Sequence, residues 1–171
     1  LIMANNESLK VKIITVSDGV FNGDREDVSG KKLEEYFEAN DWKVVEKIVI
    51  SDGTTSVASA LSELSKKFHG LIVTTGGTGF GPRDLTPEGT SKVLEREAPG
   101  LAESIRLVNP LGRLSRATAG TLGETLIINL PGSTKGSIEC VDAVFEVLGH
   151  AVRLLKDNYD PHPNQEHKKH E

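Results

Sequence analysis

The chain has 171 residues, of which 37% are hydrophobic and 26% are charged, and this composition is typical of one globular domain that buries a sizeable core. Its formal net charge of −5 argues against general nucleic-acid binding, which usually needs a basic face, but it is compatible with a small anionic ligand held by backbone amides. A single cysteine, Cys140, excludes an intramolecular disulfide, and no apolar run approaches the ~18 residues of a membrane span, so we expect a cytoplasmic protein without a membrane segment.

The first half of the chain alternates predicted strands with predicted helices. Apolar side chains crowd residues 10–16, which predicts a buried strand, and a polar loop is expected over residues 17–30. The pattern of apolar residues then predicts, in order, a helix over residues 30–40, a strand over 42–50, a helix over 54–68 and a strand over 71–75.

The second half is predicted to contain three helices and one further strong strand. Helices are predicted over residues 86–97 and 100–108, with Pro99 and Gly100 between them. Residues 109–124 are expected to be mainly loop, with room for a short strand near Thr118. A strongly apolar fourth strand is predicted over residues 125–130, and a long helix, buried on much of its surface, over residues 134–157.

These elements predict one domain over residues 10–157. Residues 1–9 are expected to form a flexible N-terminus, and the polar residues 158–171 a disordered tail. Strands that alternate with helices predict an α/β fold with a mostly parallel sheet and helices on both faces. Ligands of such sheets bind beyond the carboxyl ends of the strands, so we expect the functional site at that edge.

Each predicted strand runs into a polar or glycine-rich cluster. The four clusters are Ser17-Asp18-Gly19, Ser51-Asp52-Gly53, the glycine loop that begins at Gly76, and Asn129-Leu130-Pro131-Gly132-Ser133. If the four strands are parallel, all four clusters lie at one edge of the sheet. This convergence predicts a site more strongly than any single cluster does.

The glycine loop does not match the common phosphate-binding patterns. Gly76 and Gly81 have the spacing of a P-loop, but Pro82 and Arg83 stand where Lys and Ser or Thr should follow. The dinucleotide fingerprint also fails, because the loop follows the third predicted strand and not the first. A tight strand–helix connection is the alternative. The number of glycines, together with the Pro-Arg-Asp that follows, exceeds what a turn needs and favours a distinct nucleotide-binding loop.

Asp84 has two interpretations. A carboxylate beside a polyphosphate is the usual arrangement for Mg²⁺, whereas an aspartate in a first helical turn is stabilised by the helix dipole. Asp52, expected at the same edge, favours the metal interpretation. Asp18 and Asp52 both precede glycine, so an Asx turn is the alternative for each of them.

Other polar residues near these clusters also have two interpretations. Arg83 either neutralises charge on a transferred phosphoryl group or pairs with a neighbouring carboxylate. Ser115 and Arg116 either contact an anion or face solvent. Asn129 either contacts a base or pterin, or is a buried amide that satisfies the backbone.

The residues of the glycine loop resemble a known family signature. Gly76-Gly77-Thr78-Gly79-x-x-Pro82-Arg83-Asp84-x-Thr86-Pro87-Glu88 resembles that of the molybdopterin adenylyltransferase family, which includes stand-alone bacterial enzymes and the G domains of plant molybdenum-cofactor proteins and of gephyrin. Three further stretches resemble family motifs: Thr15-Val16-Ser17-Asp18 with Asp27-Val28-Ser29-Gly30, Pro99-Gly100-Leu101 with Leu114-Ser115-Arg116-Ala117, and residues 127–133. The chain departs from the family pattern at Gly53, at Gly112-Arg113 and at Thr134-Lys135-Gly136, and keeps both carboxylates.

The resemblance implies a fold, an activity and partners. The fold is the three-layer α/β/α fold of molybdenum-cofactor biosynthesis, and the assembly is a homotrimer. The activity is transfer of AMP from Mg-ATP to the terminal phosphate of molybdopterin, with release of pyrophosphate. Mg²⁺ is the implied cofactor, ATP the co-substrate, and a molybdenum-insertion domain a candidate partner. A non-catalytic molybdopterin-binding or scaffold module of the same fold is the alternative.

The resemblance also implies roles for single residues. Asp52 and Asp84 are implied as catalytic carboxylates and metal ligands. The implied nucleotide-binding residues are Ser17, Asp18, Gly76, Gly77, Thr78, Gly79 and Arg83. The implied pterin-binding residues are Ser115, Arg116, Asn129, Pro131, Gly132 and Ser133.

Overall fold

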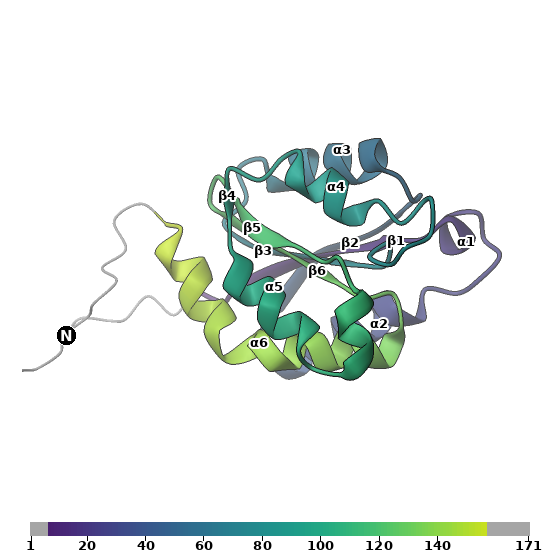
Figure 1. Ribbon diagram of the computed structural model, residues 1–171. Helices are drawn as coiled ribbons and strands as arrows, with labels where there is room; N and C mark the ends of the chain where they lie inside the picture. Colours follow the sequence, from purple (N-terminus) through teal and green to yellow (C-terminus); the bar gives the residue numbers. More distant parts are fainter. Residues whose placement is uncertain (1–6, 157–171) are drawn as a thin grey trace, which may run out of the picture.

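A six-stranded sheet forms the middle layer of the molecule (Figure 1). The structure, a computed structural model, describes residues 7–156, so the predicted tail at 158–171 and most of the predicted flexible N-terminus at 1–9 lie outside the described residues. The strand order is β2-β1-β3-β6-β5-β4. The strands are β1 (Lys10–Val16), β2 (Lys43–Ile50), β3 (Gly70–Thr75), β4 (Arg96–Glu97), β5 (Ala119–Leu122) and β6 (Thr125–Leu130).

Four of the strands are parallel, as the sequence predicts. β2, β1, β3 and β6 are mutually parallel, whereas β5 is antiparallel to β6 and to β4. Every residue of β3 and of β6 is buried. Burial on both faces explains their continuous apolar runs, because helices cover both sides of a parallel sheet.

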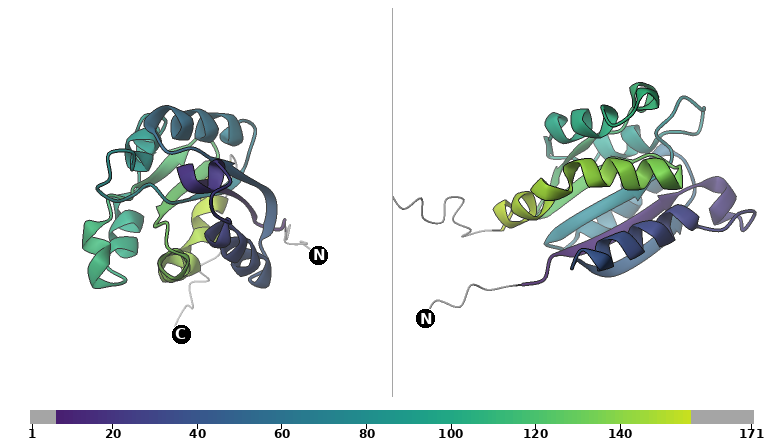
Figure 2. Two further views of the ribbon diagram at one scale, coloured as in Figure 1. Left: turned by 90° about the vertical axis from the view of Figure 1, so that its right-hand side faces the viewer. Right: turned by 90° about the horizontal axis from the view of Figure 1, so that it is seen from below.

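Helices cover the sheet on two sides (Figures 1 and 2). On one side, α2 (Val28–Ala39), α5 (Pro99–Arg106) and α6 (Thr134–Leu154) share a core with side chains such as Ile13 and Val73. On the other side, α3 (Thr54–Ser65) and α4 (Thr86–Ser91) cover the sheet, and α3 shares a second core with Ile14 and Ile72. Successive residues of a strand therefore point into different cores. The predicted three-layer α/β/α fold is confirmed.

The structure corrects some predicted boundaries. The predicted helix 86–97 ends at Ser91, because residues 95–98 hydrogen-bond to β5: Glu95 N donates to Thr121 O at 2.9 Å, and Ala98 N donates to Ala119 O at 2.8 Å. The predicted loop 17–30 contains the short helix α1 (Asp18–Phe21) and the start of α2. The predicted loop 109–124 contains the 3₁₀ helix η1 (Pro110–Leu114) and β5, which begins one residue after Thr118.

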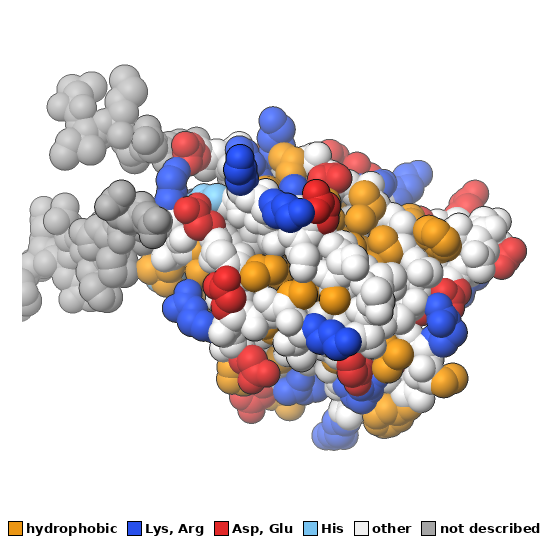
Figure 3. Space-filling model, turned by 90° about the horizontal axis from the view of Figure 1, so that it is seen from above, with side chains coloured by type: hydrophobic (Ala, Val, Ile, Leu, Met, Phe, Trp, Pro, Cys, Tyr) orange, Lys and Arg blue, Asp and Glu red, His pale blue; other side chains and the backbone are white. Residues whose placement is uncertain are grey.

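The parallel strands place their carboxyl ends at one edge of the molecule, on the right in Figure 1 and facing the viewer in the left view of Figure 2. The short helix α1 and the N-termini of α2 and α6 lie at the same edge. On the face drawn in Figure 3, positive and negative side chains are interspersed and do not form one basic patch. Within residues 7–156, the helices are too short or too polar to cross a membrane.

Among the residues of the core on the α2 side, Phe37 is expected to make a large contribution to the free energy of unfolding. This side chain is fully buried and makes edge contacts with Tyr36 and Trp42, with ring centroids 5.8 and 5.6 Å away. We expect Phe37→Ala to lower the free energy of unfolding by about 3–5 kcal/mol, because it removes buried contacts and leaves a cavity. Phe21→Ala is the matched control, since Phe21 is 58% exposed and should cost less than about 1 kcal/mol. Urea denaturation measures both, and equal losses would contradict this description of the core.

Candidate active site

A cavity of about 460 Å³ opens at the carboxyl edge of the parallel strands. All four predicted clusters contribute to its wall. The predicted residues that line it are Ser17, Asp52, Gly76, Gly77, Asp84, Gly132 and Ser133. Residues from distant parts of the chain therefore meet in one site, as the parallel arrangement predicts.

The glycine loop needs glycine at its first two positions. Gly76 and Gly77 have φ angles of +106° and +68°, which L-residues with side chains rarely adopt. A Cβ on Gly76 would lie 2.2 Å from Val16 O, and one on Gly77 would lie 2.2 Å from Thr86 Oγ1. The loop backbone therefore packs directly against the end of β1 and the start of α4.

Hydrogen bonds from α4 close this loop. Thr86 Oγ1 donates to Gly76 O at 2.9 Å, and Thr86 N donates to Gly77 O at 3.0 Å. Both bonds satisfy carbonyls of the loop within the protein, so the backbone is held in one conformation. Thr86 is the first residue of α4, and its side chain serves the loop and not the helix cap.

Arg116 holds the outer part of the same loop. Its Nε donates to Gly79 O at 2.8 Å, and its backbone N donates to Thr78 O at 2.9 Å. Its guanidinium also bonds to Asp84 O and forms an ion pair with Glu88. Although burial alone would raise the pKa of Glu88, the hydrogen bond from Arg116 lowers that pKa below its usual value. The structure thus shows Arg116 bracing the loop, and its predicted pterin contact stays a prediction.

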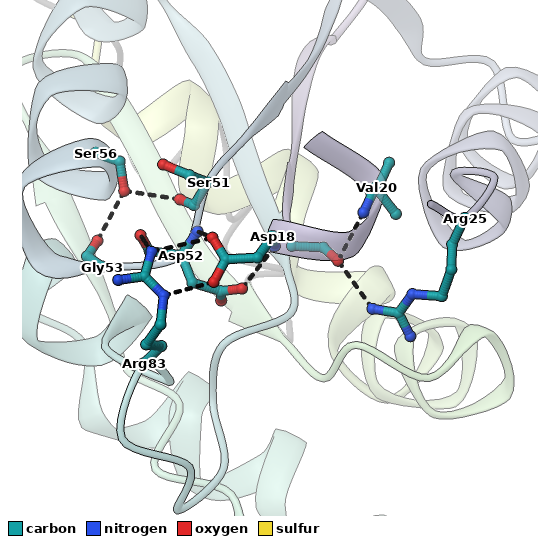
Figure 4. Close-up of polar contacts among 9 residues, drawn as sticks. Asp18, Val20, Arg25, Ser51, Asp52, Gly53, Ser56 and Arg83 are labelled. Carbon is teal, nitrogen blue, oxygen red and sulfur yellow. Dashed lines mark hydrogen bonds and ion pairs between the residues drawn. The ribbon is translucent and has the colours of Figure 1, made fainter. Parts of the chain in front are cut away.

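Asp18 and Asp52 join the ends of β1 and β2 through reciprocal hydrogen bonds (Figure 4). Asp18 N donates to Asp52 Oδ2 at 2.8 Å, and Asp52 N donates to Asp18 Oδ1 at 3.1 Å. Arg83 completes the group, because its Nη2 donates to Asp18 Oδ1 at 3.0 Å and to Asp52 O at 2.8 Å. Three segments of the chain are fixed to one another at this point.

The two carboxylates of this group have opposite electrostatic environments. The hydrogen bonds from Arg83 hold the pKa of Asp18 below its usual value. Burial raises the pKa of Asp52, and the nearby Asp18 and Asp84 charges add to that rise. Asp18 therefore serves as the partner of Arg83, and Asp52 is the carboxylate of the pair that lines the cavity.

Asp52 and Asp84 could hold Mg²⁺ if phosphate oxygens supplied further ligands. Asp84 Oδ2 accepts from Gly81 N at 2.9 Å, and Asp52 Oδ2 accepts from Asp18 N at 2.8 Å. Within the described chain, the Oδ1 atoms of both residues accept no hydrogen bond that would compete with a cation. No cluster of three or more metal-binding side chains occurs in residues 7–156. Mg²⁺ commonly takes one or two carboxylates plus phosphate oxygens, and this donor set matches that preference.

Two helix N-termini also line the cavity. Asp27 caps α2 by accepting from Gly30 N at 2.9 Å, and Ser133 caps α6 by accepting from Gly136 N at 3.2 Å. Ser29 Oγ donates to Gly132 O at 2.8 Å and thereby links the two helix starts. The N-termini of helices carry partial positive charge, so the start of α6, which has a neutral cap and no acidic residue in its first turn, favours anionic groups, whereas the Asp27 carboxylate offsets that charge at α2.

Several predicted site residues lie outside the cavity wall. Asn129 is fully buried: its side-chain nitrogen donates to Thr74 Oγ1 and Thr90 Oγ1 at 3.0 Å, and its Oδ1 accepts from Thr118 N at 3.1 Å. The structure thus shows the buried amide that the sequence left open as an alternative. The other predicted residues outside the cavity lining are Asp18, Thr78, Gly79, Arg83, Ser115, Arg116 and Pro131.

The cavity also includes residues that the sequence did not single out as site residues. The segment 25–29 and Thr134 line it, as do Thr15 and Thr75. Asp27, Val28, Ser29 and Thr15 lie in stretches that resemble a family motif, and this is the sequence signal for them; the Asp27-x-x-Gly30 spacing by itself indicates only a helix cap. No sequence pattern marks Arg25 as a site residue, because it lies in a charged loop. The fold alone brings it into the cavity wall.

Comparison with known proteins agrees with this geometry. Residues 12–150 match the family described as a probable molybdopterin binding domain. The chain belongs to this family. It is 34% identical over 160 residues to the molybdopterin adenylyltransferase of Helicobacter pylori strain 26695, an alignment that covers 90% of this chain and 91% of the relative. It is 35% identical over 158 residues to the molybdenum cofactor synthesis protein cinnamon of Drosophila melanogaster, covering 89% of this chain and 26% of that protein.

A solved structure extends the comparison to three dimensions. The molybdopterin biosynthesis enzyme MoaB from Thermus thermophilus superposes with a TM-score of 0.80 at 42% identity, covering 86% of this chain and 96% of that one. The resemblance to the adenylyltransferase family that the sequence indicates is thereby confirmed.

Gly76 is expected to be the most sensitive glycine of the site. Gly76→Ala should lower the free energy of unfolding by about 2–4 kcal/mol, because it combines an unfavourable φ with a collision against the backbone of β1. Gly100→Ala is the control: Gly100 lies in α5, its Cβ would meet nothing within 4 Å, and the change should stabilise by about 0.4–1 kcal/mol. Urea denaturation of the two variants measures the difference, and a Gly76→Ala protein as stable as the wild type would contradict the loop packing.

Proposed function

We propose that this protein transfers AMP from ATP to the terminal phosphate of molybdopterin and releases pyrophosphate. The observation that carries the proposal is that Asp52 and Asp84, from different strand ends, meet the glycine loop and two helix N-termini in one cavity. The family relatives named molybdopterin adenylyltransferase support the same reaction.

The reaction needs two anionic substrates held in line. A terminal phosphate oxygen of molybdopterin attacks the α-phosphorus of ATP, a new P–O bond forms, and the bond to the bridging oxygen of pyrophosphate breaks. Positioning and electrostatic stabilisation supply most of the catalysis in such transfers, and no acid–base pair is required. The glycine loop lets a nucleotide approach the backbone, and the start of α6 favours phosphate oxygens.

Asp52 and Asp84 would hold Mg²⁺ together with the phosphate oxygens of ATP. When bound, the ion would neutralise charge on the phosphates and on the departing pyrophosphate. Asp18 would hold the Asp52 carboxylate through its backbone N–H, and Arg83 would hold both residues in place through Asp18 Oδ1 and the backbone carbonyl of Asp52. Arg116 would keep the nucleotide loop and the Asp84 backbone in place.

The alternative of a non-catalytic molybdopterin-binding or scaffold module is not favoured. Binding alone does not require two carboxylates that line a phosphate cavity, and this chain has both. The H. pylori relative, which matches this chain over nearly its full length, carries the name of the enzyme.

The proposal is tested with purified protein, molybdopterin, ATP and Mg²⁺. We expect adenylylated molybdopterin and pyrophosphate in equal amounts, little product in excess EDTA, and a rate at least about 10²-fold lower for Asp84→Ala. Asp24→Ala is the control, because Asp24 does not line the cavity and should leave the rate unchanged. Circular dichroism checks that both variants fold. Bound ATP without product in the wild type, or full activity in Asp84→Ala, would contradict the mechanism.

The assembly and setting are also part of the proposal. A homotrimer is supported by exposed apolar side chains at the end of α5 and in η1: Leu107, Leu111 and Leu114 are 73%, 75% and 53% exposed. A molybdenum-insertion domain as partner is supported by the much longer Drosophila relative, of which this chain matches 26%. A cytoplasmic location is supported by the single, free and buried Cys140.

Leu111→Glu tests the assembly. A charge placed in an apolar interface loses solvation without gaining a partner, so we expect this variant to sediment as a monomer where the wild type sediments as a trimer. Leu154→Glu is the control, since Leu154 is 44% exposed at the end of α6, away from this group. Sedimentation velocity at micromolar concentration distinguishes the species. A monomeric wild type would contradict the trimer.

A further inference from the structure

The charged side chains that line the cavity are divided unevenly between acids and bases. Glu26, Asp27, Asp52 and Asp84 supply four carboxylates, whereas Arg25 is the one lysine or arginine among the described residues of the wall. Two phosphorylated substrates would bring several further negative charges into this space. Arg25 is therefore the side-chain cation best placed to offset them.

The other two arginines near the site are already paired with carboxylates. Arg83 forms an ion pair with Asp18, and Arg116 forms one with Glu88. Breaking either pair to bind a phosphate would leave a carboxylate without its partner, which is unfavourable beside a polyanion. Neither arginine lines the cavity.

Arg25 has a different set of contacts (Figure 4). Its Nη2 donates to Ser17 Oγ at 3.1 Å, a neutral acceptor, and no carboxylate within residues 7–156 forms an ion pair with it. A guanidinium carries five N–H donors in a planar fork that suits phosphate oxygens. Most of these donors therefore stay available for a ligand.

The position of Arg25 depends on Gly19. A Cβ on Gly19 would lie 2.7 Å from Arg25 Nε and 3.0 Å from Nη2, so the guanidinium lies directly over the backbone of α1. Arg25 N also donates to Gly19 O at 3.2 Å. The missing side chain at position 19 thus lets the guanidinium reach the cavity wall.

We propose that Arg25 binds a phosphate group of the substrate. The guanidinium exchanges its hydrogen bond to Ser17 for charge-assisted bonds to phosphate oxygens, which are stronger than a bond to a neutral hydroxyl. The N-terminus of α6, which has no acidic residue in its first turn, lines the same cavity and adds to its attraction for that phosphate. The assignment rests on the proposed function, and the phosphate belongs either to molybdopterin or to ATP.

Equilibrium binding of each substrate by itself tests the assignment, because it needs no turnover. The Kd values of ATP and of molybdopterin are measured for wild type, Arg25→Ala, Arg25→Lys and Gly19→Ala at two salt concentrations. Arg153→Ala is the control: it removes the same charge at the far end of α6, about 30 Å from Ser133 along the helix. Thermal unfolding confirms that each variant is folded.

We expect Arg25→Ala to weaken one of the two substrates about tenfold, with a smaller loss at high salt. The substrate that weakens identifies the phosphate. Arg25→Lys should recover part of the affinity, since it keeps the charge without the planar fork. Gly19→Ala should weaken the same substrate about threefold, because its Cβ displaces the guanidinium while the charge stays. Arg153→Ala should bind as the wild type does.

Unchanged binding of both substrates by Arg25→Ala would overturn the role of Arg25 and leave the proposed function intact. Equal weakening in Arg25→Ala and Arg153→Ala would overturn it as well, because the effect would then be one of net charge. Wild-type binding by Gly19→Ala would overturn the placement of the guanidinium over α1. A wild-type protein that binds neither substrate would contradict the proposed function itself.

Discussion

The alignment of four parallel strands, β2, β1, β3 and β6, is the constraint on which the rest of this structure depends. β3 and β6 are buried along their whole length, so helices must cover both faces, and each strand must leave the sheet at the same edge before a helix returns the chain. That edge collects the polar residues that follow the strands. The cavity is a direct consequence of this arrangement.

The edge is held together by a few hydrogen bonds between strand ends. The reciprocal bonds of Asp18 and Asp52 join β1 to β2, and Thr75 Oγ1 donates to Pro131 O at 2.7 Å to join β3 to the segment after β6. The glycine loop fits between them because Gly76 leaves room for Val16 O. These contacts hold the strand ends in position without a bound ligand, which suits a reaction that depends on positioning.

Acidic and basic groups both line the cavity. Asp52 and Asp84 share it with Arg25, with the start of α6 and with the further carboxylates Glu26 and Asp27. Asp52 and Asp84 suit a divalent cation, and Arg25 and the start of α6 suit phosphate oxygens. Arg83 and Arg116 both lie within the motif stretches of the sequence. In the structure, Arg83 bonds to Asp18 and Arg116 bonds to the glycine loop. Proximity to a motif therefore does not show which arginine lines the cavity.

The sequence by itself determined the layered fold, the edge at which the cavity lies, and the place of Asp52 and Asp84 at that edge, because apolar runs report burial and the chain order of strands and helices reports parallel pairing. Only the tertiary structure decided what the individual polar side chains do. Asn129 faces the interior, Arg116 braces a loop, Arg83 pairs with Asp18, and Arg25 reaches the cavity over Gly19. Residues 92–97 leave their predicted helix for the same reason, since β5 supplies hydrogen-bond partners that no local pattern contains. The partners of Asn129, Arg116 and Arg83 lie far away in the chain, and those of Arg25 are close in sequence but meet it only through the fold of the loop after β1, so a one-dimensional pattern does not reveal them.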